Sequence, residues 1–534
     1  MEDRIMQIGV KLMPDARQRQ REEGDTFPGR TYAEVVLEPA YEQAKKELLG
    51  PMIAVSKAHL IMLEEQGLVA EEDAAVIAQA LQNLDLKKLE NGHYTGEFED
   101  LFFEVEHELE HLGGETTGHL HLARSRNDMG IAIYRIVLRA KLLTLIASGL
   151  ELQERLIDFA EEHAETLMIG YTHTQQAQPT TVGHYIAAVS DSLTRDVRRL
   201  RAAYANCNRS SLGAAALTTT GFAISRERTA ELLGFDETIA NAYDAVSGTD
   251  YVLEIASSVS IAAVNLGRFV QELLLWGTQE FAAIRVAAPY VQISSIMPQK
   301  RNPVSVEHLR SLLSSCVGDA NTVLSMVHNT PFGDIVDTED DLQPYAWRSL
   351  RTLDSAYRLL ARIIETLEVD REVLRQRAEM SYATVTELAD TLVRKEGLGF
   401  RTAHAIVAEF VHTAVSAGLS VKELTVAGLD EAAKSITGRP ISLTSEDLRQ
   451  ALDPEHFVGI RSVPGGPSPG ELRRALAVQT STRKQAEEWA ERTRDFIDSK
   501  LKILDQMLTE RHCRPYHPLG NVADLSAKGG RNGV

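Results

Sequence analysis

The stretch from about residue 129 to residue 168 constrains the fold more than any other part of the chain. It contains no proline, and Gly149 is the one glycine in its interior. Apolar residues recur there at alternating steps of four and three, the spacing of a heptad seam. This pattern predicts a long helix packed in a bundle, in which Gly149 lets a neighbouring helix approach closely. The seam residues are Leu138, Leu142, Leu145, Gly149, Leu152, Leu156 and Phe159.

Further apolar segments predict helices that are also much longer than the usual three turns. Strand signals are weak, because alternation of Val, Ile, Thr and Tyr is nearly absent. We therefore expect an all-α fold. Several of these helices are rich in Ala and Ser, which suits close packing in a homo-oligomer. The expected helices cover residues 179–208, 240–283, 304–328, 340–367 and 470–509. A helical pattern also runs from about residue 33 to a stop at Gly67, and shorter helices are expected near 70–83 and 97–112.

The composition excludes several classes of protein. The 534 residues include 56 Lys and Arg and 76 Asp and Glu, for a formal charge of −20. Apolar residues make up 44% and charged residues 25%, values typical of globular proteins, so a wholly disordered chain is excluded. The acidic balance argues against a general nucleic-acid-binding protein, which needs a basic face.

The sequence also predicts a soluble, cytoplasmic protein. The N-terminus has no apolar segment typical of a secretory signal, and no run of 18 apolar residues could span a membrane. The three cysteines cannot form a disulfide framework, and their spacing does not suit metal ligands. They are Cys207, Cys316 and Cys513.

A polar segment with proline joins two of the predicted long helices, and it reads Q-I-S-S-I-M-P-Q-K-R-N-P over residues 292–303. Loops of this kind carry function on rigid scaffolds. The alternative is an ordinary solvated connection between helices. The side chains in it that could take part in chemistry are Ser294, Ser295, Lys300, Arg301 and Asn302.

A second segment, G-H-L-H-L-A-R-S-R-N-D over residues 118–128, contains planar donor groups. The side chains of Arg124, Arg126 and Asn127 could bind a carboxylate through paired hydrogen bonds. The alternative is a capped helix start with solvated arginines.

Two histidine motifs give weaker signals. His119 and His121 form an H-x-H pair, but no third ligand lies within reach in the sequence, so we expect no metal site. In the segment Y-T-H-T-Q-Q-A-Q-P, residues 171–179, Thr172 is a hydrogen-bond donor and His173 is a candidate proton-transfer group. A single histidine is more often a packing residue than a catalytic one.

Together, these three segments resemble the fumarase/aspartase superfamily and, within it, the argininosuccinate lyase branch. The superfamily's loop S-S-x-M-P-x-K-x-N-P is matched by residues 294–303. The branch motif A-R-S-R-N-D is matched by residues 123–128, and T-H-x-Q-x-A-Q-P by residues 172–179. The resemblance extends over nearly the whole chain, and S-K-A-H at residues 56–59 is a weaker match.

The resemblance implies a homotetramer of subunits with three mostly helical domains. In this family the central helices of four chains build a twenty-helix core, and each active site takes residues from three subunits. The implied division of this chain is 1–123 for an N-terminal helical domain, 124–372 for the central long-helix bundle and 373–534 for a C-terminal helical domain with an irregular tail.

The family reaction is a reversible anti β-elimination that releases fumarate from a succinyl compound, without a metal or organic cofactor. By resemblance Ser294 is the general base, and its alkoxide needs stabilisation by Lys300, backbone N–H groups and exclusion of water. Lys300 and Asn302 stabilise the carbanion intermediate. By resemblance, Arg126, Asn127 and Thr172 bind the succinyl carboxylates. His173 and Glu307 form a pair whose part in proton transfer stays open. Further substrate contacts are implied for Ser56, Ser295 and Met297.

The amine side of the implied site departs from the branch. Argininosuccinate lyases carry Tyr, Gln and Lys where this chain has Asp334, Glu339 and Leu342. This change removes one cation and adds two carboxylates, so a cationic amine should be preferred over a leaving group with a free carboxylate. We therefore expect a carbon–nitrogen lyase for an aminopolycarboxylate, as in bacterial ethylenediaminedisuccinate lyase. The alternatives are argininosuccinate lyase itself and, more remotely, a catalytically silent protein like the lens crystallins of this family.

Overall fold

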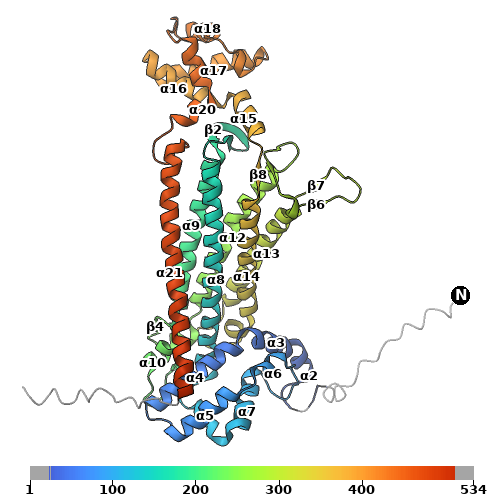
Figure 1. Cartoon of the computed structure of the whole chain (residues 1–534), viewed down its shortest axis with the longest axis vertical. Helices are drawn as coiled ribbons and strands as arrows, with labels where there is room; N and C mark the ends of the chain where they lie inside the picture. Colours follow the sequence, from blue (N-terminus) through green and yellow to red (C-terminus); the bar gives the residue numbers. More distant parts are fainter. Residues whose placement is uncertain (1–22, 25, 511–534) are drawn as a thin grey trace, which may run out of the picture.

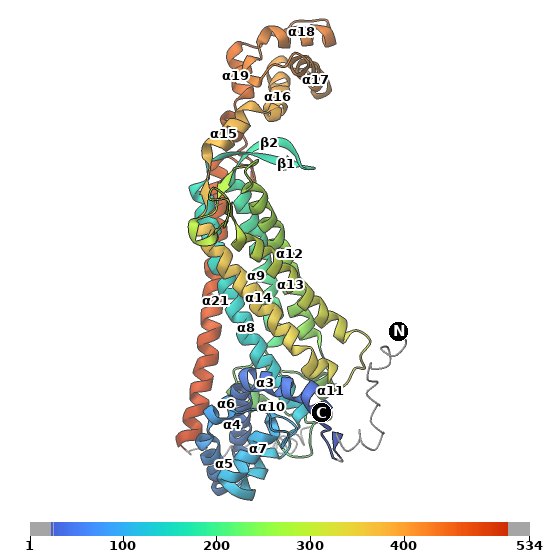
Figure 2. The same ribbon diagram turned by 90° about the vertical axis from the view of Figure 1, so that its right-hand side faces the viewer.

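The computed structural model describes residues 23–24 and 26–510 of the chain. They form a long rod with a helix bundle in the middle and a smaller helical group at each end (Figures 1 and 2). The sequence also predicts an irregular arm over about residues 1–30 and an irregular tail from Cys513. The tail and nearly all of the arm lie outside the described residues.

The bundle confirms the predicted helical fold and its long helices. Helix α8 lies among the others along almost the full length of the bundle, and α21 packs along α8 and α9 (Figure 1). The domain boundary expected at residue 373 would assign α21 to the C-terminal domain. Apolar side chains of α21, however, form part of the core of the bundle. The bundle helices are α8 (Arg126–Glu162), α9 (Val182–Cys207), α12 (Asp250–Trp276), α13 (Val304–Val327), α14 (Gln343–Glu365) and α21 (Pro469–Glu510).

The heptad-like seam of α8 is buried along its whole length. Leu138, Leu145 and Leu152 have no exposed surface. A Cβ atom on Gly149 would lie 3.3 Å from the ring of Tyr357 on α14. The glycine therefore permits the close approach of two helices that the sequence predicts at this position.

Two helix predictions were wrong in their bounds. Helix α8 ends at Glu162 instead of 168, and the chain then forms a hairpin of β1 (Leu167–Thr172) and β2 (Gln175–Thr181). The apolar run of β1 was too short to separate from the end of a helix by its pattern. The helix predicted over 240–283 is divided near Gly248 into α11 (Ala242–Ser247) and α12, and it ends at Trp276.

The N-terminal group packs around its own apolar core at one end of the bundle. Helix α4 lies at its centre, and both α4 and the start of α8 contribute side chains to this core. The elements are α2 (Arg30–Tyr32), η1 (Ala33–Leu37), α3 (Glu38–Glu47), α4 (Leu49–Glu65), α5 (Glu71–Asn83), α6 (Leu86–Asn91), α7 (Leu101–Gly113) and η2 (Gly114–His121).

The C-terminal group lies at the opposite end of the rod, beyond the β1–β2 hairpin (Figure 2). It has a separate small core formed by α16 to α19. The elements are α15 (Arg371–Met380), η5 (Tyr382–Thr384), α16 (Val385–Glu396), α17 (Phe400–Ser416), η6 (Val421–Glu423), α18 (Val426–Thr437), α19 (Ser445–Leu452) and α20 (Pro454–Gly459).

Short elements connect the long helices. Strands β6 (Gln292–Ile293) and β7 (Arg301–Asn302) pair at the base of a hairpin that projects sideways from the bundle (Figure 1). The others are β3 (Arg209–Ser210), α10 (Arg226–Leu232), β4 (Glu237–Thr238), β5 (Ile284–Arg285), η3 (Ala288–Tyr290), η4 (Asp337–Asp341) and β8 (Glu368–Val369).

One described helix, α12, is long and apolar enough to cross a membrane by length and composition, although the sequence analysis expected no such segment. Half of its most apolar part is buried, where it packs against α9, α13 and α14 in the bundle. This is the packing of a core helix. Its other face exposes Ile261 (42%), Val264 (50%) and Leu275 (44%) in the single chain.

Gly183, at the start of α9, tests the junction between the bundle and the β1–β2 hairpin. A Cβ atom there would lie 2.3 Å from the carbonyl oxygen of Ala160 on α8. We expect Gly183→Ala to lower the free energy of unfolding by about 1–3 kcal/mol, because backbone must move. The control Gly470→Ala replaces an exposed glycine in the first turn of α21, where the new Cβ would meet open space, and should be neutral or stabilising. Equal effects of both variants in urea unfolding would contradict this account.

Candidate active site

The first turn of α8 is fixed by a buried carboxylate. Ser125 caps the helix, and Asp128 completes a capping box by accepting the Ser125 backbone N–H at 3.0 Å. The same carboxylate accepts the backbone N–H groups of Gly213 (2.8 Å) and Ala215 (3.0 Å). Burial raises the pKa of Asp128 to about 6, against the opposing effect of these three donors. The turn that carries Arg126 is therefore held to the loop that follows β3.

Arg126 and Asn127 project from this fixed turn and are both engaged by acidic side chains. Arg126 donates to Asp100 Oδ2 at 2.7 Å and lies 3.4 Å from Glu99 Oε1. Asn127 Nδ2 donates to Asp334 Oδ2 at 2.5 Å. A substrate carboxylate would thus have to compete with Asp100 for the Arg126 guanidinium.

Glu339 and Asp334 form a carboxyl pair beside α8. The structure places Glu339 within hydrogen-bonding reach of Asp334, and its Oε1 lies 3.7 Å from where a Cβ on Gly130 would be. Burial, the hydrogen bond to Asp334 and the nearby charges of Asp334 and Asp340 raise the pKa of Glu339 to about 9. At neutral pH the pair therefore shares one proton. The charges of these two residues are evident from the sequence, whereas their closeness is a property of the fold.

Ser56 lies behind this region and is almost fully buried, at 3% exposed. Its hydroxyl accepts a hydrogen bond from Arg124 Nη1 at 3.3 Å. In the same segment His59 bonds the carbonyl oxygen of Leu122 at 2.8 Å, and burial lowers the pKa of His59 to about 3. In this conformation Ser56 supports the segment before α8, and its predicted substrate contact stays a prediction.

The H-x-H pair faces two different acidic side chains. His119 lies 3.5 Å from Asp73, and His121 lies 3.2 Å from Glu106. Within residues 23–24 and 26–510, no three or more His, Cys, Asp or Glu side chains gather in a way that could hold a metal ion.

The β1–β2 hairpin presents Thr172 and His173 at its tip. The turn has two residues, His173 and Thr174, with φ angles of 50° and 63°. Such a turn usually contains glycine or asparagine, because side chains rarely adopt this left-handed conformation. Strained backbone of this kind is often found where function fixes it. Thr172 and His173 are both exposed in the single chain.

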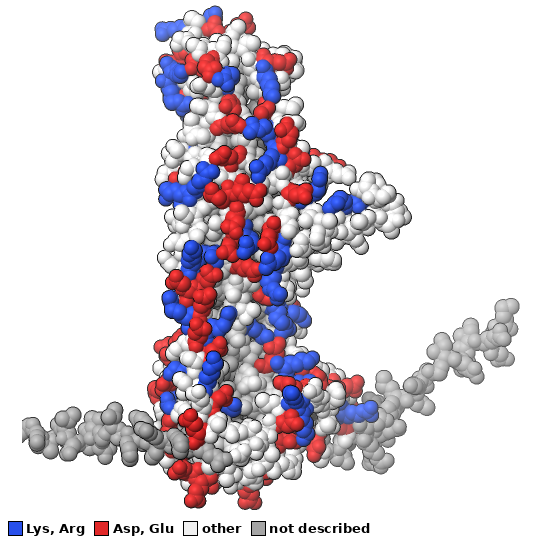
Figure 3. Space-filling model, in the orientation of Figure 1, with Lys and Arg blue, Asp and Glu red and all other residues white. Residues whose placement is uncertain are grey.

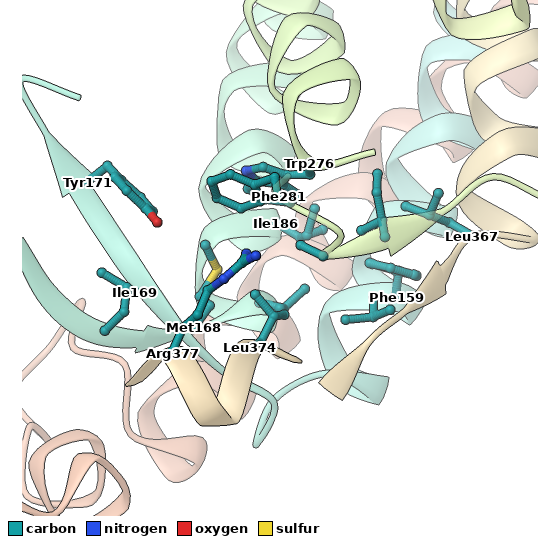
Figure 4. A pocket seen from close by; sticks show the side chains of 14 residues that line it. Phe159, Met168, Ile169, Tyr171, Ile186, Trp276, Phe281, Leu367, Leu374 and Arg377 are labelled. Atoms are coloured by element: carbon teal, nitrogen blue, oxygen red, sulfur yellow. The ribbon is translucent and has the colours of Figure 1, made fainter. Parts of the chain in front are cut away.

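Apolar side chains that line a pocket support this hairpin (Figure 4). Met168, Ile169 and Tyr171 from β1 line a pocket whose other wall includes Trp276 and Phe281 from the end of α12 and the turn after it. These contacts fix the base of the hairpin against the bundle, so its tip has a defined position.

The projecting loop holds Ser294 among backbone donors. Ser294 Oγ accepts the backbone N–H of Met297 at 3.1 Å and of Ile296 at 3.4 Å. Two such donors lower the energy of a negative charge on that oxygen. The loop thus supplies, within one chain, part of the stabilisation that a serine base requires.

The base of this loop borders a surface hollow of about 560 Å³. Ser295 is exposed beside Ser294. Within the part of the chain that the structure describes, no hydrogen bond or ion pair joins His173 to Glu307. The predicted site residues that line the hollow are Met297, Lys300, Asn302 and Glu307.

The predicted site residues fall into separate places in one chain. Asn127 contacts Asp334 at the N-terminal end of α8, whereas Thr172 lies beyond its C-terminal end. The 37 residues of α8 span about 55 Å between them. The Ser294 loop projects from the side of the bundle (Figure 3), and Ile293 (72%) and Ile296 (83%) on it are exposed.

The sequence analysis missed three groups that contact this region. Asp100 pairs with Arg126, and Tyr134 donates a hydrogen bond to Asp340. These partners lie 26 and 206 residues apart, so no local pattern indicates them. The available signal in the sequence was that Glu339 and Asp340 belong to an acidic segment.

Comparison with known families matches most of the chain. Residues 39–318 match the family described as Lyase, and residues 382–459 match the family described as Argininosuccinate lyase C-terminal. Argininosuccinate lyase 2 of Agrobacterium fabrum is 39% identical over 500 residues, which cover 93% of this chain and 99% of that protein. Argininosuccinate lyase of Methanocaldococcus jannaschii is 36% identical over 86% of this chain and 93% of that protein.

Solved structures also resemble this chain. The crystal structure of EDDS lyase in complex with formate has a TM-score of 0.82 and 30% identity, over 93% of this chain and 98% of that one. Class II fumarase of Schistosoma mansoni has a TM-score of 0.63 at 17% identity over 77% of this chain and 90% of that one, which is a likeness of fold alone.

The raised pKa of Glu339 predicts a pH-dependent effect of Glu339→Gln. The folded chain binds a proton there that the unfolded chain releases near 4.5, so this group lowers stability as pH rises from about 4.5 to about 9. Removing the group should make the variant progressively more stable, relative to the wild type, across that range. Thermal unfolding between pH 5 and about pH 9 measures this. The control Asp337→Asn, exposed on the same segment, should show a much smaller trend. A difference in Tm that is constant with pH would contradict the buried pair.

Proposed function

Because this chain belongs to the argininosuccinate lyase branch of the fumarase/aspartase superfamily, we propose that it cleaves an N-substituted L-aspartate into fumarate and an amine. It is a carbon–nitrogen lyase that releases fumarate. The observation that carries the proposal is the Ser294 loop, in which two backbone N–H groups point at Ser294 Oγ. Within the loop that matches the family motif, these donors lie where a negative charge on the serine oxygen needs stabilisation.

In the proposed reaction the Ser294 alkoxide takes the Cβ proton of the succinyl group. The electron pair moves into the adjacent carboxylate, where Lys300 and Asn302 stabilise the added charge. The Cβ electrons then form the double bond of fumarate as the Cα–N bond breaks, and the amine leaves with a proton. His173 and Glu307 are the candidates for delivering that proton, while Arg126, Asn127 and Thr172 hold the carboxylates.

We also propose that the complete site needs several copies of the chain in a homotetramer. The rigid helix α8 is about 55 Å long and separates Asn127, in its first turn, from Thr172, which lies beyond its other end, so one chain cannot bring both to one substrate. The apolar face of α12 and the apolar tip of the Ser294 loop are exposed in the single chain and suit burial against other copies. Residues 124–372, as the central domain, would build the shared helix core.

Two substrates have support of different kinds. Relatives over nearly the whole chain are named argininosuccinate lyase, which favours argininosuccinate over the aminopolycarboxylate that the sequence analysis placed first. The specific observation for the second candidate is the Asp334–Glu339 carboxyl pair at the amine side, together with the likeness to EDDS lyase. Asp334 and Glu339 are proposed substrate-binding residues for either compound.

Ser294→Ala tests the base. We expect kcat for fumarate release, followed by ultraviolet absorbance, to fall at least about 100-fold with either substrate, because general-base catalysis is lost. Argininosuccinate and ethylenediaminedisuccinate are offered separately to the wild type, and the ratio of kcat/KM identifies the substrate. The exposed neighbour Ser295→Ala is the matched variant and should lose less kcat. Full activity of Ser294→Ala would overturn the assignment, and a wild type that releases no fumarate from any N-substituted aspartate would overturn the proposed function.

Mixing inactive variants tests the shared site. Ser294→Ala and Asn127→Ala chains, unfolded together and refolded, should regain activity well above either parent, because some sites then receive both intact residues. Ser294→Ala with Lys300→Ala is the control. Both residues lie on one loop of one chain, so every site keeps a defect and no activity should return. Equal recovery in the two mixtures, or none in either, would contradict a site built from several chains.

A further inference from the structure

Two exposed aromatic rings stack beside the carboxyl pair. Tyr243 on α11 and Phe332 in the segment after α13 have ring centroids 6.1 Å apart and planes inclined by 13°. Both rings stay open to solvent, with 43% and 65% of their surface exposed. Large rings that stack in the open leave apolar faces available to a ligand.

The backbone connects this aromatic pair directly to the acidic side chains. The Tyr243 hydroxyl lies 3.9 Å from the position that a Cβ on Gly333 would take. The next residue, Asp334, accepts the hydrogen bond from Asn127 and lies within hydrogen-bonding reach of Glu339. The rings therefore lie beside the backbone of the segment that bears Asp334, and Asp334 in turn contacts Asn127 and Glu339.

Resting on the proposed function, we propose that Tyr243 and Phe332, with Asp334 and Glu339, bind a positively charged ammonium group carried by the leaving amine. Aromatic faces attract cations, and the attraction is stronger where water is partly excluded. Carboxylates beside the rings add a charge-assisted partner. Specificity would then come from the far end of the amine, away from the bond that breaks.

The same surface offers little to a carboxylate on the leaving amine. Position 342, where the branch carries a lysine, is a leucine with no exposed surface. The nearby cation, Arg126, is already paired with Asp100 and Glu99. A free carboxylate placed beside Asp334 and Glu339 would be repelled, because like charges there lie close together in a partly buried site.

The chemistry is shared by both candidate substrates. Argininosuccinate presents the α-ammonium of its arginine half, and a diamine presents its second nitrogen. Two probes separate ammonium from carboxylate recognition on the same guanidino chain. Agmatine keeps a terminal ammonium and has no carboxylate, whereas 5-guanidinopentanoate keeps a terminal carboxylate and has no ammonium. Ethylenediamine is the third probe and distinguishes a diamine from a guanidino amine.

Inhibition of the wild-type enzyme by these three compounds is the first measurement. We expect agmatine or ethylenediamine to bind at least about tenfold more tightly than 5-guanidinopentanoate. The double variant Tyr243→Leu/Phe332→Leu should weaken the ammonium compound about tenfold and leave 5-guanidinopentanoate unchanged. The matched control is Phe496→Leu, a similarly exposed ring on α21, which should change neither.

Proton release on binding of an ammonium compound gives a second readout. It is not expected if the rings have only a structural role. Binding of an ammonium should displace the proton shared by Glu339 and Asp334, so calorimetry in two buffers of different ionisation heat should detect release near neutral pH. Asp340, Arg126 and Tyr134 are the other ionisable groups that face Glu339 or its neighbours. In Glu339→Gln the release should disappear.

Three results would overturn the proposal. They are tighter binding of 5-guanidinopentanoate than of either ammonium compound, unchanged ammonium binding in a folded Tyr243→Leu/Phe332→Leu enzyme, or no measurable binding of any probe. Failure of the proposed function is a different outcome. In that case the wild type would release no fumarate from any N-substituted aspartate, while agmatine or ethylenediamine would still bind with proton release.

Discussion

Helix α8 fixes the separation between the two ends of this molecule. Its seam is buried among α9, α14 and α21, so it can neither bend nor shorten without opening the core. One end carries Asn127, and the hairpin beyond the other end carries Thr172. A rod of about 55 Å between two groups that are proposed to bind one small substrate is a strong constraint. It makes association of chains the simplest route to one complete site.

At the N-terminal end of α8, a buried carboxylate fixes the positions of neighbouring polar side chains. Asp128 holds the first turn through three backbone donors, and Asn127 is thereby placed against Asp334. Desolvation then favours a shared proton over two charges at Asp334 and Glu339. In the proposed complex, a cationic amine displaces this proton. The aromatic rings of Tyr243 and Phe332 lie next to it and extend the same preference for positive charge.

The fold was predictable where periodicity is long. The alternating steps from Leu138 to Phe159 predict α8, and Gly149 predicts the close contact that Tyr357 makes. The β1–β2 hairpin was missed because its apolar run, Leu167–Ile169, follows a helix directly and its turn contains neither Asn nor Gly. Packing of β1 against Trp276 and Phe281, more than 100 residues away, stabilises a turn that local preference disfavours.

The sequence by itself determined the helical class, the family and the set of chemical groups, because periodicity and motif spacing are local properties of the chain. It identified Ser294, Lys300, Asn302, Thr172 and His173 as chemistry-bearing residues, and Asp334 and Glu339 as a change of charge. Only the tertiary structure decided which of these groups meet. The Asn127–Asp334 hydrogen bond and the pairing of Arg126 with Asp100 depend on packing between separate segments of the chain. Burial, the hydrogen bond to Asp334 and the neighbouring charges together raise the pKa of Glu339.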